Sequence, residues 1–120
     1  MAKKWLPAAD VEMDENDRVG VFVPIPTTLA GGTKTVAAAA TPEALVGAST
    51  PCKFVWIGAP CDGDGASTNT KPAFIGDSAS QNIPLLVANF EGVLIAVDDA
   101  QKIYVKVGVN GEAVAYRIFA

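Results

Sequence analysis

Apolar and polar side chains alternate along most of the chain that follows residue 18. In the segment 102–109, every second residue from Ile103 to Val109 is aliphatic, and Tyr104 and Lys106 stand between them. A period of two is typical of a strand that has one face in a hydrophobic core. Breakers rich in Gly, Pro, Asn and Asp, among them Gly31-Gly32, recur about every 8 to 12 residues, which is the spacing of a β-sandwich or barrel. The predicted strands span residues 19–25, 33–39, 43–46, 52–58, 72–76, 83–88, 92–97, 102–109 and 113–119.

The pair Asn110-Gly111 separates the last two predicted strands. A type I′ turn needs positive φ at both central residues, and Asn and Gly tolerate that conformation. In the strand that follows, Val114, Tyr116 and Ile118 alternate with residues of the opposite face. We therefore expect a β-hairpin at this point, with one face in the core.

The segment 36–40 is ambiguous, because it consists of Val36 followed only by alanines. Alanine favours helix, but Thr41-Pro42 follows at once and leaves too few residues for a stable helix. We interpret the segment as the end of a strand.

The composition indicates one domain with a substantial core. The chain has 120 residues, of which 50% are hydrophobic and 18% are charged. A chain of this length can build a core without disulfide or metal support. The small charged fraction indicates that part of the surface lies against a partner. We predict an all-β fold, with an arm at residues 1–18 and a single antiparallel β-sandwich of about eight or nine strands at 19–120.

Residues 1–18 differ from the rest, because acidic and apolar residues follow each other with neither a helical nor a strand period. We interpret them as an irregular N-terminal arm that is ordered by contact with something else; a frayed terminus is the alternative. Trp5 and Leu6 have no core of their own in so short a segment, and tryptophan is common among interface anchors. Both are candidate interaction residues.

Charge and hydropathy exclude two classes of partner. The net charge of −4 argues against nucleic acid, because phosphate binding needs clustered Lys and Arg. No apolar run approaches the roughly 20 residues of a membrane span. Pro7 and Asp10 interrupt the apolar start too early for a signal peptide, so we expect the protein to stay in the compartment where it is made. Cys52 and Cys61 are then expected to be reduced, and a bridge between them is the alternative.

The chain contains no histidine, which removes the commonest general base and metal ligand. Ser78, in Gly76-Asp77-Ser78, therefore lacks an ordinary activating partner, and we interpret it as a turn residue. Asp98 and Asp99 are adjacent at a strand end, where their side chains diverge, and we interpret them as turn or cap residues.

The stretch 62–65 begins like a calcium loop, with Asp62 and Asp64. An EF-hand loop needs further ligands at its fifth and twelfth positions, and these are Ala66 and Ala73 here. We interpret the stretch as a polar turn, with a loop ion held by the two carboxylates as the alternative. The sequence thus predicts no catalytic, cofactor-binding or metal-binding residue, and a protein that is not an enzyme.

Phe54 and Trp56 alternate with Val55 and Ile57, so the strand 52–58 is apolar on both faces. Such a strand is buried once in its own core and once under another layer or subunit; burial in the core alone is the simpler alternative. Phe54 and Trp56 are therefore candidate interaction residues. The second apolar face predicts a homo-oligomer, either a dimer or a trimer.

Several turns and strand entries between about residues 33 and 119 form a recognisable layout. They are Lys34-Thr35-Val36, Thr50-Pro51-Cys52-Lys53-Phe54-Val55-Trp56-Ile57, Ile75-Gly76-Asp77-Ser78, Val97-Asp98-Asp99, Lys102-Ile103-Tyr104-Val105, Asn110-Gly111-Glu112 and Ala115-Tyr116. This layout resembles a family of small virion proteins of tailed bacteriophages. Residues 1–32 and the long loop 59–71 depart from the family's pattern.

The resemblance implies a jelly-roll-like β-sandwich on the phage particle, as a capsid decoration (cement) protein or the base domain of a head fibre. Such a protein is assembled in the host cytoplasm, binds the major capsid protein on the exterior of the head, and stabilises it. A receptor- or glycan-binding module of a head or tail fibre is the second interpretation. The loop 61–71 carries polar residues for that role but no aromatic residue.

Overall fold

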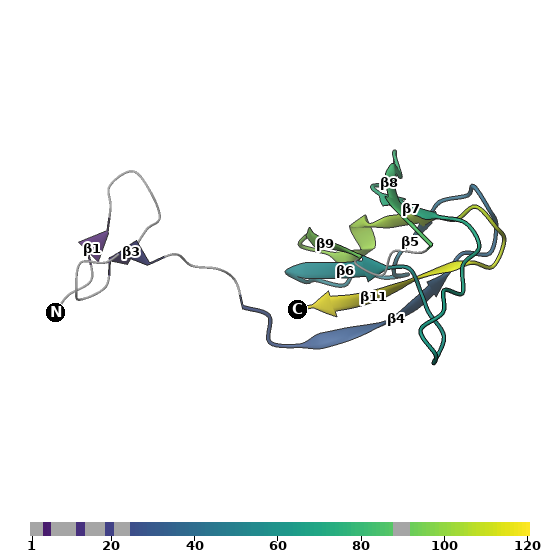
Figure 1. Cartoon of the computed structure of the whole chain (residues 1–120). Coiled ribbons are helices and arrows are strands. Elements are labelled where there is room, and N and C mark those ends of the chain that lie inside the picture. The colour runs from purple at the N-terminus through teal and green to yellow at the C-terminus, as the bar shows by residue number, and fades with distance from the viewer. Residues whose placement is uncertain (1–3, 6–11, 14–18, 21–24, 88–91) are drawn as a thin grey trace.

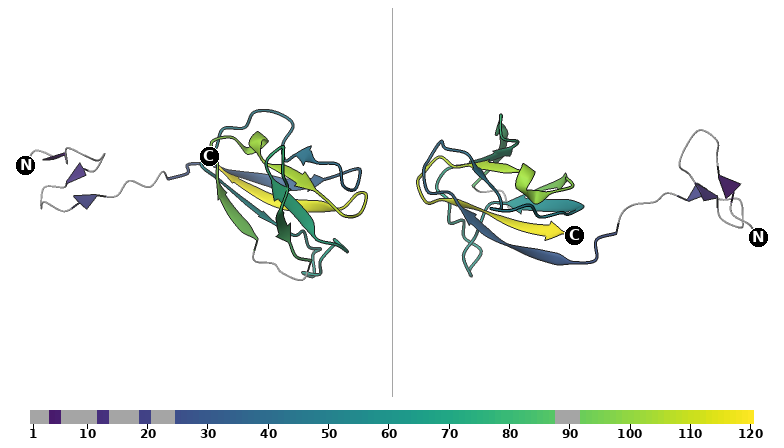
Figure 2. Two further views of the ribbon diagram at one scale, coloured as in Figure 1. Left: turned by 90° about the horizontal axis from the view of Figure 1, so that it is seen from above. Right: turned by 180° about the vertical axis from the view of Figure 1, so that it is seen from behind.

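The computed structural model describes residues 25–87 and 92–120, together with the backbone of 4–5, 12–13 and 19–20. Two antiparallel sheets of four strands each form a β-sandwich (Figure 1). Figure 2 shows the two layers from above and from behind. The predicted all-β sandwich is confirmed. Most of the predicted arm, Leu6 included, lies outside the described residues.

The first sheet has the strand order β5-β10-β7-β8, and the second has the order β4-β11-β6-β9. The first contains β5 (Glu43–Ala44), β10 (Tyr104–Lys106), β7 (Ala73–Gly76) and β8 (Ile83–Leu85). The second contains β4 (Leu29–Thr35), β11 (Ala113–Phe119), β6 (Phe54–Gly58) and β9 (Val93–Ala96). A short 3₁₀ helix, η1 (Ala100–Lys102), precedes β10. A small third sheet pairs β1 (Lys4–Trp5), β2 (Glu12–Met13) and β3 (Val19–Gly20) in that order.

The core lies between the two four-stranded sheets and is aliphatic. Alternate residues of each strand point inward, so Val55 and Ile57 of β6 meet Ile75 of β7 and Val105 of β10 with no exposed surface. Burying a side chain of this size contributes roughly 1.5–3 kcal/mol. The inward positions predicted from the alternation in 102–109 and 113–119 are confirmed by the core members Ile103, Val105, Val107, Val114 and Ile118.

The predicted hairpin around Asn110-Gly111 is wrong, because β10 and β11 belong to different sheets. The turn is also of a different type. Gly111 has φ +81° while Asn110 is outside the positive region, which is the pattern of a type II turn. Besides its own bond from Glu112 N–H to Val109 O at 3.2 Å, the turn is bonded to the segment 36–40. Gly111 N–H donates to Val36 O at 2.9 Å, and Asn110 Oδ1 accepts from Ala39 N–H at 2.7 Å. A distant segment thus takes the place of the expected partner strand.

The predicted strand 33–39 is shifted. β4 runs from Leu29 to Thr35, and the alanine segment that follows is a turn in which Ala40 has φ 63°. Ala40 N–H donates to Val107 O at 2.9 Å, so the turn is fixed by the β10–β11 connection. The pair Gly31-Gly32, which we expected to break the chain, lies inside the strand.

Other strand boundaries differ by shorter lengths. In the predicted strand 19–25, Val19–Gly20 is a strand that pairs with β2 in the small third sheet, and residues 21–24 lie outside the described residues. The predicted strand 102–109 is reduced to Tyr104–Lys106, because η1 occupies its beginning. β6 and β11 match the predictions closely.

A candidate interaction face

β6 divides its side chains between two environments. Val55 and Ile57 are fully buried in the core, so Phe54 and Trp56 point to the other side of the same sheet. Both aromatic residues are half-buried there. The structure therefore places the two strand residues predicted as interaction candidates side by side on one surface.

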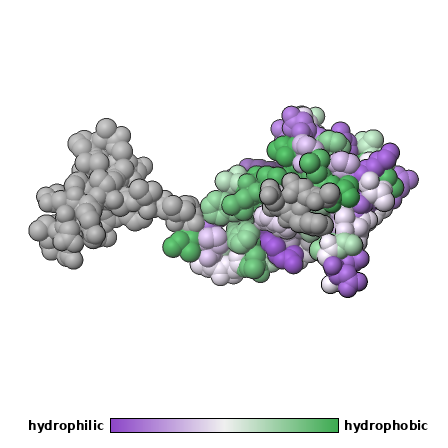
Figure 3. Space-filling model, in the orientation of Figure 1, coloured by the Kyte–Doolittle hydropathy of each residue, from purple (hydrophilic) through white to green (hydrophobic). Residues whose placement is uncertain are grey.

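The neighbouring strands extend this apolar surface. In the register of the sheet, Trp56 lies between Leu94 of β9 and Arg117 of β11, and Phe54 lies between Ala96 and Phe119. Leu94 is 61% exposed and adds aliphatic surface beside Trp56. Hydrophobic side chains are visible around β6 and β9 in Figure 3. We call this surface the outer face; its residues are Leu29, Phe54, Trp56, Leu94, Ala96, Arg117 and Phe119.

Two glycines give Trp56 its position on the outer face. A Cβ on Gly58 would come within 2.6 Å of Trp56 Cη2, and one on Gly92 would come within 2.6 Å of Cε2. The indole therefore lies close against the backbone of Gly58 in β6 and of Gly92, the residue before β9. Gly92 also has φ +64°, which favours glycine independently of the contact.

Arg117 is held against the adjacent strand in a similar way. A Cβ on Gly31 would lie 2.3 Å from Tyr116 O and 2.7 Å from Arg117 Cδ. Arg117 Nη1 donates to Tyr116 O at 2.8 Å, while the residue as a whole is exposed. The outer face thus combines aromatic and aliphatic surface with one fixed guanidinium. Aromatic residues and arginine are the types most enriched in protein interfaces.

A shallow, mostly apolar hollow adjoins Phe54. Its lining residues are Cys52, Lys53, Phe54, Ala96, Val97 and Asp98. Cys52 and Cys61 are both free thiols. Cys52 Sγ donates to Val97 O at 3.2 Å, and burial raises the pKa of this thiol, with the nearby Asp99 adding to the effect. The thiol is therefore a packing group of the hollow and not an activated nucleophile.

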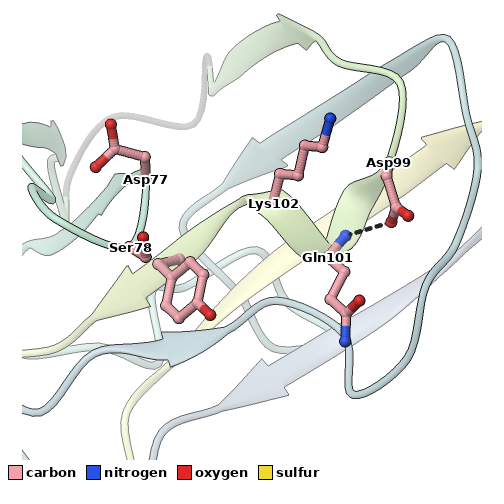
Figure 4. Close-up of a pocket in the computed structure, with 6 residues that line it drawn as sticks. Asp77, Ser78, Asp99, Gln101 and Lys102 are labelled. Atoms are coloured by element: carbon pink, nitrogen blue, oxygen red, sulfur yellow. Dashed lines mark hydrogen bonds between the residues drawn. The ribbon is translucent and has the colours of Figure 1, made fainter.

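A second hollow, on the side of η1, is polar. It is lined by Asp77, Ser78, Asp99, Gln101, Lys102 and Tyr104. Figure 4 shows Asp77 and Asp99 on opposite sides of it. Two carboxylates, a hydroxyl and an aromatic ring would suit a sugar ligand, but the carboxylates already serve the backbone. Asp77 Oδ1 accepts from the N–H groups of Ala79 and Ser80, as expected of a turn residue.

Asp99 is the N-cap of η1 and joins it to the turn before β6. Its Oδ1 accepts from Thr50 N–H at 2.8 Å and from Gln101 N–H at 2.9 Å, and its Oδ2 accepts from Ser49 Oγ. The hydrogen bond from Ser49 and the two backbone bonds lower the pKa of Asp99. The interpretation of this aspartate as a cap residue is confirmed.

The stretch 62–65 is a polar turn as well. Asp62 Oδ1 accepts from Asp64 N–H at 2.9 Å and from Ala66 N–H at 3.0 Å, and Gly65 has φ +83°. Among residues 25–87 and 92–120, no three acidic or cysteine side chains are close enough to hold a metal ion. Within the same residues, no helix is long and apolar enough to span a membrane.

The structure brings together Phe54 and Trp56 but does not place all four predicted interaction residues. Trp5 lies in β1, where only the backbone is described, and Leu6 lies outside the described residues. Sequence reasoning missed Leu94 and the contribution of Arg117. The alternation in 113–119 assigned Arg117 to the outward side, but only the β11–β6 register places it beside Trp56.

A scan against protein-family models, a search of curated proteins and a search of solved structures returned no match to this chain. An apolar outer face thus lies on one side of a sandwich in which Asp62, Asp77 and Asp99 accept hydrogen bonds from the backbone of nearby turns and of η1.

Proposed function

We propose that this chain is a non-enzymatic structural protein of a tailed-phage virion, which binds the exterior of the capsid and stabilises the head. The observation that carries the proposal is the outer face: Phe54 and Trp56 stand on a regular sheet, supported by a separate core. The likeness of the turn layout to phage virion proteins supports the same role. We also propose that the strands of the two sheets are connected as in a jelly roll.

The partner in this proposal is the major capsid protein, together with further copies of the chain as a dimer or trimer. A protein that binds only the assembled lattice lowers the free energy of that lattice by the binding energy at each site. No catalytic step is needed. The acidic net charge of −4 suits a protein that avoids the packaged DNA.

The test is co-sedimentation with purified empty capsids, using a matched pair of variants. Phe54→Ala removes an aromatic ring from the outer face. Phe74→Ala removes a half-buried ring from the first sheet, where Lys106 Nζ lies 5.6 Å from the centroid of that ring. An interface aromatic that anchors binding typically contributes about 2 kcal/mol, roughly thirtyfold in affinity. Phe54→Ala should weaken capsid binding by that factor, and Phe74→Ala should leave it unchanged.

The same assay separates the second function. If the protein sediments with host cells and not with capsids, the glycan-binding interpretation is favoured and the cement role is refuted. If both variants bind capsids as tightly as the wild-type chain, the outer face is not the contact surface.

A further inference from the structure

The two sheets have four edges, and three of them are short or blocked in the described part of the chain. β5 has two residues, β8 has three and contains Pro84, and β9 has four. β4 is different, because it is a seven-residue edge strand without proline. Proteins usually protect such an edge, since its free backbone groups are a template for another strand.

The backbone of β4 presents a complete set of hydrogen-bonding groups to the outside. Thr28 and Ala120 exchange both backbone bonds, each at 3.0 Å, which fixes the alternation along the β4–β11 ladder. The N–H and C=O groups of the even-numbered residues of β4 therefore point toward β11. The N–H and C=O groups of the odd-numbered residues face away from it, and these residues are all exposed: Leu29, Gly31, Thr33 and Thr35.

Lys34 is the one charged residue of β4, and its side chain does not protect this edge from pairing with another strand. Lys34 Nζ lies 3.0 Å from Glu43 Oε1, and Glu43 Oε2 accepts from Ala37 N–H at 3.1 Å. The bond from Lys34 and the backbone bond from Ala37 lower the pKa of Glu43, which keeps it ionised. The ammonium is thus drawn to β5 of its own sandwich instead of projecting from the edge as a lysine gatekeeper would.

We propose that two copies of this chain pair through β4, antiparallel, about a two-fold axis at Gly32. In this register Leu29 lies opposite Thr35 of the second copy, and Gly31 lies opposite Thr33, so every outward N–H and C=O of both strands is paired. Gly32 faces its own equivalent, where neighbouring Cα atoms approach to about 4.5 Å, and it has no side chain to collide. Lys34 lies opposite Ala30 and not opposite the other Lys34.

The occupant is a second copy because the edge is self-complementary in this register. A two-fold contact of this kind closes on itself and uses up the edge, so the assembly stops at a dimer. The second sheet becomes continuous across the axis, and the outer faces of both copies lie on the same side. The pairing specifies the self-association proposed above and does not depend on capsid binding.

The first experiment is sedimentation equilibrium of the isolated protein over a wide concentration range. Thr33→Pro removes an outward N–H that bonds no residue in the described part of the chain, which is the position where an edge strand tolerates proline. It should weaken dimerisation at least about tenfold, because the symmetric contact loses one bond in each copy. Thr41→Lys, at an exposed position away from β4, is the control and should dimerise like the wild-type chain.

The second experiment tests the register in a Cys61→Ser background, which removes the exposed thiol. A Cβ at Gly32 has no neighbour closer than 3.7 Å, so Gly32→Cys is compatible with the fold. Under mild oxidation this variant should form a disulfide-linked dimer, and Thr41→Cys should not. A wild-type chain that stays monomeric at every concentration, an unaffected Thr33→Pro dimer, or equal cross-linking at both cysteine positions would each overturn the proposal. Failure of capsid binding in the co-sedimentation assay would leave the dimer result intact.

Discussion

Replacing Asn69 by alanine should destabilise the sandwich more than any exposed polar substitution in the chain. Asn69 is only 5% exposed, and its amide makes two bonds to one residue of β11. Nδ2 donates to Ala113 O at 2.7 Å, and Oδ1 accepts from Ala113 N–H at 3.1 Å. The β6 strand ends at Gly58, opposite Ala115, so Ala113 lies two residues beyond the paired part of the ladder, and the side chain of Asn69 bonds its backbone groups in place of a strand.

The magnitude follows from this geometry. Losing two hydrogen bonds costs roughly 1 kcal/mol each, and leaving the buried N–H and C=O of Ala113 unpaired adds about 1 kcal/mol or more. The total is about 3 kcal/mol, which corresponds to a fall in melting temperature of roughly 12 °C for a domain of this size. Thermal unfolding followed by circular dichroism measures it directly.

The chain offers a matched control for this substitution. Asn110 also bonds a backbone N–H through its side chain, with Oδ1 accepting from Ala39 N–H at 2.7 Å, but this residue is exposed. Water can replace that bond, so Asn110→Ala should cost no more than about 1 kcal/mol. Equal losses for the two variants would refute the reasoning, because burial would then not decide the cost.

Three further outcomes are expected. Gly111→Val forces a β-branched residue toward φ +81° and should lower the free energy of unfolding by about 1–3 kcal/mol, and an unchanged urea midpoint would exclude strain at this turn. The pKa values of Glu43 and Asp99 are lowered by their hydrogen bonds from Lys34 and Ser49, respectively, so the folded state binds fewer protons than the unfolded chain. Stability should therefore be full at neutral pH and fall as the pH drops below the ordinary values of 4.5 and 3.8, whereas urea unfolding that is equal at pH 7 and pH 3 would contradict this. If residues 1–18 clamp a capsid subunit, Trp5→Ala should weaken capsid co-sedimentation by roughly thirtyfold with the melting temperature unchanged, and tight binding would make the arm a frayed terminus.

The sequence predicts the individual strands of this fold better than their partners. Alternation assigns the inward and outward residues of β6 and β11 correctly, because the period of two is a local property of the backbone. Asn110-Gly111 is correctly a turn, yet its neighbours do not form a hairpin. Strands β10 and β11 belong to different sheets, and the turn between them bonds Val36 and Ala39. These two residues lie some seventy positions earlier in the chain, so no local pattern could indicate them.

The outer face shows the same division. Phe54 and Trp56 could be assigned to one surface from their spacing alone. The exposed Leu94 could not be added, because no local pattern states that β9 pairs with β6. The sequence did not predict the first part of the edge strand β4 for a different reason, because a pair such as Gly31-Gly32 is typical of a break between strands. Only the structure shows that a side chain at residue 31 would collide with Tyr116 O and Arg117.

The half-buried position of Trp56 also makes its fluorescence a probe of the outer face. The chain has two tryptophans, so a Trp5→Phe variant emits from Trp56 alone. Its indole lies against the backbone of Gly58 and Gly92, and the residue is half-buried on the outer face. Emission should move to shorter wavelength when a partner covers the outer face and displaces water from it, and quenching by iodide should decrease in parallel. Occupancy of the outer face can thus be followed in solution, in real time, without attaching a dye to the particle.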